Sequence, residues 1–395
     1  MGGSWSSPPK AGGSENQPQQ DVEEHLTITG LGSAWPEAGV GTKQLREYAE
    51  KLYPADSPWL QKLVMVAGQT GIENRAVIES WNDEKWWGPT PPTIEQVHDE
   101  FDKYAPPLTA RAARKALDES GIAASAITHM VSVTATNCKC PGYDHLVAKE
   151  LGISEEAERS LIAGSGCAGG LAALRVANSM ACAATLRGRP ARILVVACEL
   201  SSINLRAELE AAHKTGKLRI GAALFSDGAA AVVLCNKLAL TEKTPRLFSI
   251  VDWAQHVSPD TYDQVSVDTG SNGFLVYLSK HLPGHAAAAV HMPLRRLFGG
   301  GGKNENGLPD PKKCDWALHA GGAAIIQGVA KSVGITNGQL RATNEIYRTK
   351  GNTASVTVLA VLDKLRTMGP GTRDVVICSF GPGLTVEMAR LRRYC

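Results

Sequence analysis

Apolar positions along the chain follow two spacings, one typical of buried strands and one typical of amphipathic helices. Short unbroken apolar stretches, as at 129–137 and 191–198, are expected of strands covered on both faces. Apolar residues that recur every three or four positions, as in 44–67 and 94–120, indicate helices. Because the two kinds of stretch alternate along the chain, the pattern predicts an α/β protein whose sheets are covered by helices.

The same alternation continues to the C-terminus. Further strands are predicted at 26–32, 247–253, 316–319 and 375–379, and at 229–235 after a tight turn at Asp227–Gly228. Further helices are predicted at 147–151, 168–187, 277–297, 323–333 and 353–368. Proline lacks the backbone donor that a helix interior needs, so we expect breaks near 54–58, 106–107 and 293.

Two parts of the chain share this order of elements without visible sequence identity. We therefore expect a duplicated core, with one half at 25–250 and the other at 251–395. Residues 1–24 are mainly Gly, Ser, Pro and Gln with almost no apolar side chains, which predicts a disordered tail. Residues 1–6 also fit the short myristoylation pattern, and the sequence leaves that modification open.

The segment 161–170, Leu-Ile-Ala-Gly-Ser-Gly-Cys-Ala-Gly-Gly, joins a β-prone stretch to a helix through glycines. Cys167 lies at or near the start of that helix, where free N–H groups and the positive dipole end favour a thiolate. The neighbouring glycines allow a bulky acyl substrate to approach the backbone. A nucleophilic cysteine is one interpretation, and a small buried residue at a packed helix start is the other.

Composition and charge narrow the classes of partner. The 395 residues are 43% hydrophobic with a formal net charge of +2, too small to favour nucleic acid or an anionic membrane. The nine cysteines are scattered, and the one close pair, Cys138 and Cys140, lacks the spacing of a metal site. We find neither a signal peptide nor an apolar run long enough to span a membrane. We expect a cytoplasmic protein with no metal and no integral membrane segment.

Two further polar residues resemble Cys167 in their setting, a strand end or a helix start beside glycine. They are His319, in Leu-His-Ala-Gly-Gly, and Asn352, in Lys-Gly-Asn-Thr. The carboxyl ends of strands converge on one crevice in doubly wound sheets, so the three residues can meet. A thiolate–imidazolium pair attacks a thioester, and an imidazole N–H and an amide can hold its oxygen as negative charge develops. Taken singly, His319 also fits a half-buried structural histidine, and Asn352 a helix N-cap.

These residues lie in segments that resemble the type III polyketide synthases, the chalcone synthase-like enzymes of the thiolase-fold superfamily. The resemblance runs from about residue 26 to the C-terminus and is closest to the fungal members. Its specific pieces are Gly-Cys-Ala-Gly-Gly around Cys167, Leu-Phe-Ser-Asp-Gly-Ala-Ala around Phe225, Trp-Ala-Leu-His-Ala-Gly-Gly around His319, Gly-Asn-Thr-Ala-Ser around Asn352 and Ser-Phe-Gly-Pro-Gly-Leu-Thr-Val-Glu from Ser379. It implies a thiolase-like duplicated αβαβα layered fold.

The resemblance also implies an activity. The enzyme would be an acyltransferase that condenses malonyl-CoA iteratively onto an acyl-CoA starter. Cys167 would carry the starter and the growing chain, while His319 and Asn352 would activate the thiolate and promote malonyl decarboxylation. Members of the family are homodimers that use CoA thioesters and no metal or redox cofactor.

The same resemblance also implies which residues line the substrate cavity and the tunnel that binds CoA. It assigns gating or cavity positions to Phe225, Val276, Ser201, Asn204, Ala354, Gly381, Pro382 and Gly383, and a position that reaches the neighbouring subunit's cavity to Cys140. It assigns CoA contacts to Lys62, Gly321 and Ala324, whereas Met65 and Gln69 stand where basic residues are usual. Plant members have a second gating phenylalanine where this chain has Val276. We therefore expect a medium- or long-chain aliphatic starter and alkylpyrone, alkylresorcinol or resorcylic acid products.

Three alternatives stay open at this level. A ketoacyl synthase III-type enzyme shares the Cys, His and Asn set but condenses once. A Cys-His-Asn hydrolase has the same chain order, although the protease signature beside the cysteine is missing from this sequence. A thiolase-fold scaffold without activity would not need all three residue types.

Overall fold

The computed structural model describes residues 26–394 apart from 80–82, 84–85, 87 and 300–307. The tail predicted at 1–24, with its myristoylation pattern, lies outside the described residues. The strands are β1 (Thr27–Ala34), β2 (Gly39–Val40), β3 (Arg75–Ala76), β4 (His129–Val133), β5 (Glu158–Ile162), β6 (Arg192–Leu200), β7 (Asp227–Cys235), β8 (Phe248–Val257), β9 (Val265–Gly270), β10 (Gly273–Leu278), β11 (Asp315–Leu318), β12 (Asp374–Gly381) and β13 (Thr385–Arg393).

Helices connect these strands and cover their faces. They are α1 (Thr42–Leu52), α2 (Pro58–Gln69), α3 (Ile94–Ser120), α4 (Tyr143–Leu151), α5 (Gly169–Leu186), α6 (Leu205–Thr215), α7 (Gly221–Leu224), α8 (Leu282–Ala289), α9 (His291–Phe298), α10 (Ala323–Val333), α11 (Arg341–Lys350) and α12 (Ser355–Leu365). Three short 3-10 turns matter for the site, namely η4 (Gly166–Ala168), η5 (Ser201–Asn204) and η7 (Pro382–Leu384).

Nine strands form one sheet in the order β11-β12-β13-β8-β1-β7-β6-β4-β5. In one half β4 runs parallel to β6, and β6 runs antiparallel to β7. The other half repeats this arrangement, because β11 is parallel to β12 and β12 is antiparallel to β13. The two halves join where β1 pairs with β8. The boundary predicted at residue 250 falls inside β8.

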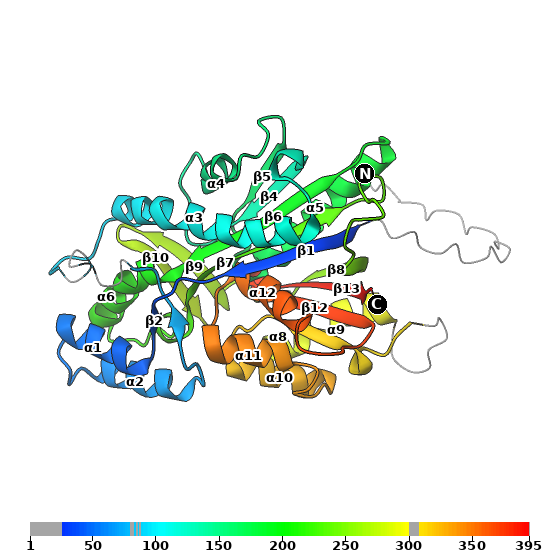
Figure 1. The fold of residues 1–395 in the computed structure, drawn as a ribbon. Coiled ribbons are helices and arrows are strands. Elements are labelled where there is room, and N and C mark those ends of the chain that lie inside the picture. The colour runs from blue at the N-terminus through cyan, green and yellow to red at the C-terminus, as the bar shows by residue number, and fades with distance from the viewer. Residues whose placement is uncertain (1–25, 80–82, 84–85, 87, 300–307, 395) are drawn as a thin grey trace, which may run out of the picture.

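The contacts between helices and strands define the layers of the fold. Helix α3 lies on β1, β7 and β6, while α12 contacts β7, β1 and β6 as well as β11 and β12, and it also packs on α5. A central apolar cluster therefore draws on both halves, with Leu171 of α5 and Leu359 of α12 both buried in it. Helices α8, α9 and α10 enclose a separate cluster on the C-terminal half. Figure 1 shows α3 above the sheet and α10, α11 and α12 below it. This layered α/β arrangement confirms the predicted thiolase-like fold.

The break predicted at Pro106–Pro107 is wrong, since α3 runs unbroken through both prolines. The helix lies directly on β1, where a Cβ at Gly30 would come within 1.9 Å of the carbonyl oxygen of Ala116. The helix also buries Phe101 and many small residues along its length. Burial along the whole helix offsets the two missing N–H donors, which a local sequence pattern does not capture.

The C-terminal half departs from the prediction at residues 277–297. Tyr277 belongs to strand β10, and the helices α8 and α9 meet at Val290 instead of Pro293. Pro293 lies in the first turn of α9, where a missing N–H costs no hydrogen bond. The hairpin β9–β10 and strand β13 are additions that the pattern did not predict.

The tight turn predicted at Asp227–Gly228 is also wrong. Both residues are extended at the start of β7, where Asp227 pairs with Leu200 of β6. The chain reverses earlier, in the one-turn helix α7 and the two residues after it. This places Phe225 before the strand and beside Asn352, with which it forms an isolated parallel bridge.

Candidate active site

Cys167 lies in η4, the 3-10 turn that leads from the region of β5 into α5. This confirms the predicted turn before a helix, with the cysteine just ahead of the first α-helical residue. Gly166 has φ of 48°, a left-handed conformation that suits glycine. A Cβ there would also lie 2.7 Å from Cδ of Pro382, so the turn that holds Cys167 and the loop after β12 are in direct contact.

Gly381 also packs against the turn that holds Cys167. A Cβ at Gly381 would lie 2.6 Å from both the carbonyl oxygen of Ser165 and Cβ of Ala168. The hydroxyl of Ser379 donates a hydrogen bond of 2.7 Å to the carbonyl oxygen of Cys167. The Gly-Pro-Gly segment therefore supports the backbone that holds the cysteine.

His319 follows the last residue of β11, and its backbone N–H donates to the carbonyl oxygen of Cys378. The imidazole is buried, and its Nδ1 has no hydrogen-bond partner. A Cβ at Gly321 would lie 3.1 Å from Nε2, and the glycine therefore leaves that edge of the ring open.

Asn352 precedes α12, and its backbone is held on both sides of Phe225. Its N–H donates to the carbonyl oxygen of Leu224, and its carbonyl oxygen accepts from Ser226 N–H. The side-chain Oδ1 accepts hydrogen bonds from Ala354 N–H at 2.9 Å and from the hydroxyl of Thr357 at 3.3 Å. These bonds fix the amide so that its N–H groups face the site.

The structure brings the three predicted residues together around one cavity. Cys167, His319 and Asn352 all line an empty space of about 390 Å³, together with Phe225. The amide of Asn352 also hydrogen-bonds to the Cys167 side chain, which lowers the pKa of the thiol. A thiol, an imidazole and a carboxamide from segments far apart in sequence thus face the same volume.

Burial opposes charge on both the thiol and the imidazole. It raises the pKa of Cys167 to about 12, an effect to which the nearby carboxylate of Glu199 adds. It lowers the pKa of His319 to about 3. The free site therefore favours the neutral thiol and neutral imidazole. A thiolate–imidazolium pair forms only by proton transfer between them, when the two charges offset each other's desolvation.

Glu199 is a fully buried carboxyl group near Cys167 that the sequence analysis did not single out as part of the site. It accepts hydrogen bonds from Ala135 N–H at 3.0 and 3.1 Å, from Thr136 Oγ1 at 2.9 Å and from Ser355 Oγ at 2.5 Å. Burial raises its pKa. The only sequence signal was its place directly after the stretch predicted as a buried strand, 191–198; in the structure it lies within β6.

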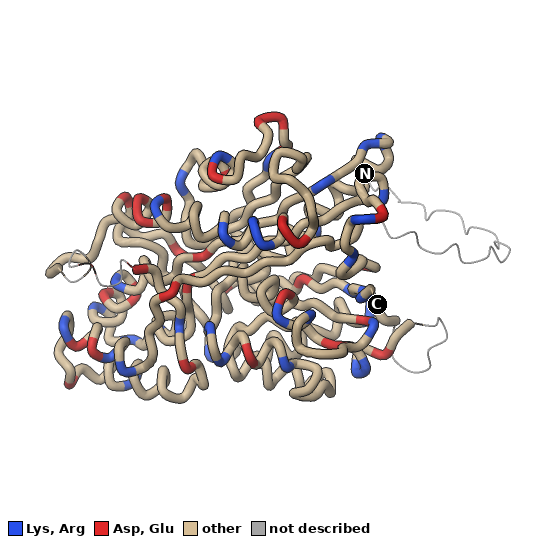
Figure 2. The backbone as a smooth tube through the Cα atoms, viewed as in Figure 1, with Lys and Arg blue, Asp and Glu red and all other residues tan. Residues whose placement is uncertain are grey.

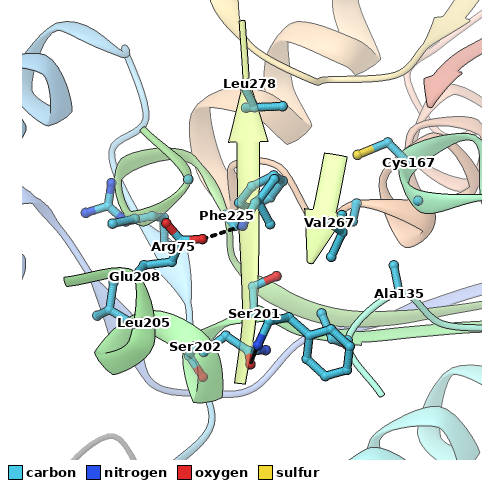
Figure 3. Close-up of a pocket in the computed structure, with 18 of the residues that line it drawn as sticks. Arg75, Ala135, Cys167, Ser201, Ser202, Leu205, Glu208, Phe225, Val267 and Leu278 are labelled. Carbon is cyan, nitrogen blue, oxygen red and sulfur yellow. Dashed lines mark hydrogen bonds between the residues drawn. The ribbon is translucent and has the colours of Figure 1, made fainter. Parts of the chain in front are cut away.

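A second, larger cavity, of about 910 Å³ of empty space, adjoins the first, and Cys167 and Phe225 line both (Figure 3). Its lining includes Cys167 and six of the predicted cavity residues, namely Phe225, Val276, Ser201, Asn204, Ala354 and Pro382. Gly381 lines the smaller cavity, whereas Gly383 lines neither of these two. Cys140 is exposed and lines neither of them.

Besides Glu199, three residues near the large cavity were missed by the sequence analysis. Arg75 and Glu208 line the large cavity, where Glu208 binds Arg219 and the backbone N–H of Val276. Asp227 accepts hydrogen bonds from the backbone N–H groups of Ile78 and Ser202 at 2.8 Å each and so supports the cavity floor. No local motif marks Arg75 or Glu208, and Asp227 lies in the motif around Phe225 without a role assigned to it.

A third cavity, of about 1060 Å³ of empty space, leads toward the imidazole from the surface. Its lining includes Gly321 and Ala324, two of the predicted CoA-contact residues, and also Gln69, Lys280 and Tyr347. Lys62 is exposed on α2, four residues before the lining residue Val66, and does not itself line the cavity. Figure 2 shows Lys and Arg interspersed with Asp and Glu over the molecule, without one large patch of a single sign.

The described part of the chain was also compared with what a metal site and a membrane span require. No cluster of His, Cys, Asp or Glu there has the composition to hold a metal ion. One helix, Gly166–Leu186, is long and apolar enough to cross a membrane, but its most apolar window is 56% buried. It packs on β4, β6 and α12, which identifies it as a core helix.

Comparisons with known proteins agree with this geometry. The family "Chalcone and stilbene synthases, N-terminal domain" matches residues 14–237, and the corresponding C-terminal domain family matches residues 249–394. The chain is 41% identical over 384 residues to type III polyketide synthase pspB of Penicillium soppii, covering 93% of this chain and 96% of that protein. It is 31% identical to acylalkylpyrone synthase csyB of Aspergillus oryzae, covering 96% of this chain and 97% of that protein.

Solved structures give the same result. A type III pentaketide synthase from Neurospora crassa superimposes with a TM-score of 0.89 at 38% identity, covering 93% of this chain and all of that one. CsyB complexed with CoA-SH superimposes with a TM-score of 0.89 at 30% identity, with the same coverage. The chain therefore belongs to the chalcone and stilbene synthase family and is a type III polyketide synthase, an acyltransferase that condenses malonyl-CoA.

Proposed function

We propose that Cys167 carries the acyl starter and the growing chain, and that His319 and Asn352 act on both thioesters. The convergence of these three residues on one cavity, with a larger cavity beside it, carries this proposal. Sγ attacks the thioester carbon of acyl-CoA, its proton passes to His319, and CoA leaves as the thiol. The acyl group is then held on the cysteine at the mouth of the large cavity.

Malonyl-CoA next loses carbon dioxide at the same site. Nε2–H of His319 and Nδ2–H of Asn352 donate to the thioester oxygen, where negative charge develops as the enolate forms. The enolate carbon attacks the acyl carbon on Cys167, the bond to sulfur breaks, and the product is a β-ketoacyl-CoA two carbons longer. These steps exchange no electrons with an external donor or acceptor, so the proposed cycle uses CoA thioesters without a further cofactor.

The starter in this proposal is a medium- or long-chain fatty acyl group. The large cavity is lined mainly by apolar side chains, among them Val267, Val276 and Leu278 of the β9–β10 hairpin. Each buried methylene contributes about 0.8 kcal/mol, so several of them outweigh other preferences. The similarity to a protein named acylalkylpyrone synthase supports alkylpyrones among the products, beside alkylresorcinols and resorcylic acids.

The third cavity is the proposed path for the CoA arm. It reaches Gly321 beside His319 and carries Lys280 on its wall, with Lys62 four residues before the lining residue Val66. Lys280 supplies part of the positive charge that Met65 and Gln69 do not, because a phosphate group needs a cation or an N–H donor. The related CsyB has been solved as a complex with CoA-SH, which supports CoA as the ligand.

A homodimer is part of the same proposal. Strand β5 is an edge of the nine-stranded sheet, and Leu161 on it is 39% exposed. Cys140 is also exposed, in the loop between β4 and α4. An unpaired strand edge beside an exposed apolar side chain favours pairing with a second copy. Light scattering of the purified protein should give twice the 41.9 kDa of one chain.

The proposed function is tested with a panel of acyl-CoA starters and malonyl-CoA, with products identified by mass. We expect turnover without added metal, a preference for aliphatic over aromatic starters, and products that contain more than one malonyl-derived unit. A clear preference for 4-coumaroyl-CoA would overturn the starter assignment. A single condensation on carrier protein would favour a ketoacyl synthase activity instead.

A further inference from the structure

The turn that carries Asn352 is held by two buried hydroxyl groups that line none of the three cavities. They belong to Ser226, the residue after Phe225, and to Thr357, in the first turn of α12, and both residues are 0% exposed. Because neither faces a ligand, any effect on the reaction passes through the residues that they contact.

Ser226 bridges the two ends of this turn. Its hydroxyl oxygen lies 2.5 Å from the carbonyl oxygen of Lys350 and 3.1 Å from Oγ1 of Thr353. A carbonyl oxygen only accepts, so the single hydroxyl hydrogen of Ser226 goes to Lys350, and the hydroxyl of Thr353 donates to Ser226. One side chain thereby holds the backbone before Asn352 and the residue after it.

Thr357 links the same turn to the amide itself. Its Oγ1 accepts the backbone N–H of Thr353 at 2.8 Å and donates to Oδ1 of Asn352 at 3.3 Å. Oδ1 also accepts the N–H of Ala354, so two donors hold the amide oxygen. Turning the amide over would set Nδ2 against these donors, and Nδ2 therefore stays directed toward Cys167.

Hydrogen bonds in a chain polarise one another, and two donors on an amide oxygen draw charge from its N–H groups. Such an N–H donates more strongly to an oxygen on which negative charge develops. We propose that Ser226 and Thr357 are positioning residues for Asn352, which aim and strengthen the amide N–H that holds the thioester oxygen during decarboxylation. Ser226 acts on the backbone of the turn, and Thr357 acts on the amide oxygen.

This inference rests on the proposed function and deepens it, because it assigns how one of the two oxygen donors is held ready. A purely structural role of the two hydroxyl groups predicts a different pattern. Their loss would then lower the melting temperature and slow the reaction by the same factor whether or not the Asn352 side chain is present.

The test measures the conversion of malonyl-CoA to acetyl-CoA by the unmodified enzyme and its variants. Thr357→Val keeps the shape of threonine without the hydroxyl, whereas Thr357→Ser keeps the hydroxyl. We expect Thr357→Val to lower kcat about tenfold with KM within about twofold, the effect of one hydrogen bond on a barrier, and Thr357→Ser to recover most of that loss. Ser226→Ala should lower kcat about threefold, because it acts through the backbone of the turn.

Thr109→Val is the matched control. The hydroxyl of Thr109 is also buried, but it donates to the carbonyl oxygen of Ala105 within α3. Its removal should leave the decarboxylation rate unchanged.

A double-mutant cycle with Asn352→Ala separates positioning from structure. In that background Thr357→Val should change the rate by less than about twofold, because the group that it positions is gone. An equal fall in both backgrounds, or an unchanged rate in the folded single variant, overturns the inference. If Thr357→Val does not fold, Ser226→Ala carries the same comparison. If Asn352→Ala decarboxylates as fast as the unmodified enzyme, the proposed function itself fails.

Discussion

The side-chain amide of Asn352 donates a hydrogen bond to the backbone carbonyl oxygen of Gly321 over 3.2 Å. This bond joins the loop after β11, which carries His319, to the loop before α12, which carries Asn352. The two proposed donors to the thioester oxygen are therefore held relative to each other by the protein and not by the substrate. Such prior arrangement is what makes donors effective when charge develops.

Gly321 should tolerate no side chain. In Gly321→Ala the new Cβ would meet Cδ2 of His319 at 2.9 Å and Nε2 at 3.1 Å, so the ring must move. A displacement of about 1 Å at a reacting group costs up to about 100-fold in rate. We expect kcat/KM to fall by that order while thermal unfolding changes little. Gly322→Ala is the matched control, because a Cβ there meets nothing within 4 Å, and it should keep most of the activity.

Decarboxylation and condensation should separate when the cysteine is removed. Cys167→Ala cannot hold an acyl group and should form no polyketide, yet it should still convert malonyl-CoA to acetyl-CoA, because both oxygen donors remain. Asn352→Asp keeps the acceptor for Ala354 N–H but loses the donor, and it should decarboxylate about 100- to 1,000-fold more slowly. Acetyl-CoA release, measured by chromatography, checks both. Loss of decarboxylation in Cys167→Ala would contradict the proposed division of roles between the cysteine and the two donors.

Val276 should set the room available to the starter. It lines the large cavity from β10, while Tyr277, the next residue on the strand, points to the other face and is 49% exposed. Val276→Phe fills space that several methylenes would occupy, each worth about 0.8 kcal/mol. The ratio of kcat/KM for long-chain over short-chain acyl-CoA should fall more than tenfold. Tyr277→Phe should leave that ratio as it is, and an equal change in both variants would argue against this role.

Asp227 should make stability depend on pH in a defined direction. Burial raises its pKa from 3.8 to about 6, so between these values the folded state holds a proton that the unfolded state has released. The free energy of unfolding therefore falls as the pH rises through this window, by roughly 3 kcal/mol for this group. Asp227→Asn cannot titrate and loses an acceptor for the N–H groups of Ile78 and Ser202.

The comparison for Asp227 uses urea unfolding of both proteins at several pH values. The unmodified protein should be the more stable at pH 4, and its advantage over Asp227→Asn should shrink up to about pH 6.5 and then stay level. An advantage that instead grows with pH would show that the ionised carboxylate is the favoured form in the folded state.

Lys280 should contribute to CoA binding through charge. It lies on the wall of the third cavity, so Lys280→Ala should raise KM for malonyl-CoA about fivefold at low salt and less at high salt. Lys331→Ala, on the exposed last turn of α10, is the control and should leave KM unchanged. Initial rates at two salt concentrations give KM for malonyl-CoA in both variants. If KM rises equally in the two variants, the effect belongs to net charge and not to this site.

The sequence by itself determined the order of most elements and the type of each reactive residue. Local composition was enough for this, because the conformations of the glycine turn at Cys167 and of the helix at Ala323–Val333 are set by residues adjacent in the sequence. It failed where packing overrules local preference, as in α3, which continues through Pro106 and Pro107 because the sheet beneath it buries the whole helix.

Only the tertiary structure decided which residues share a cavity and which polar groups are satisfied. Ser226 stands out because its hydroxyl bonds Lys350 and Thr353, which lie 124 and 127 residues away, a property of three-dimensional neighbours that no spacing along the chain records. Likewise, Gly381 matters because the turn that holds Cys167 lies 2.6 Å from where a Cβ at this position would be. The sequence supplied the chemical groups, and close packing of distant segments determined which of them can act together.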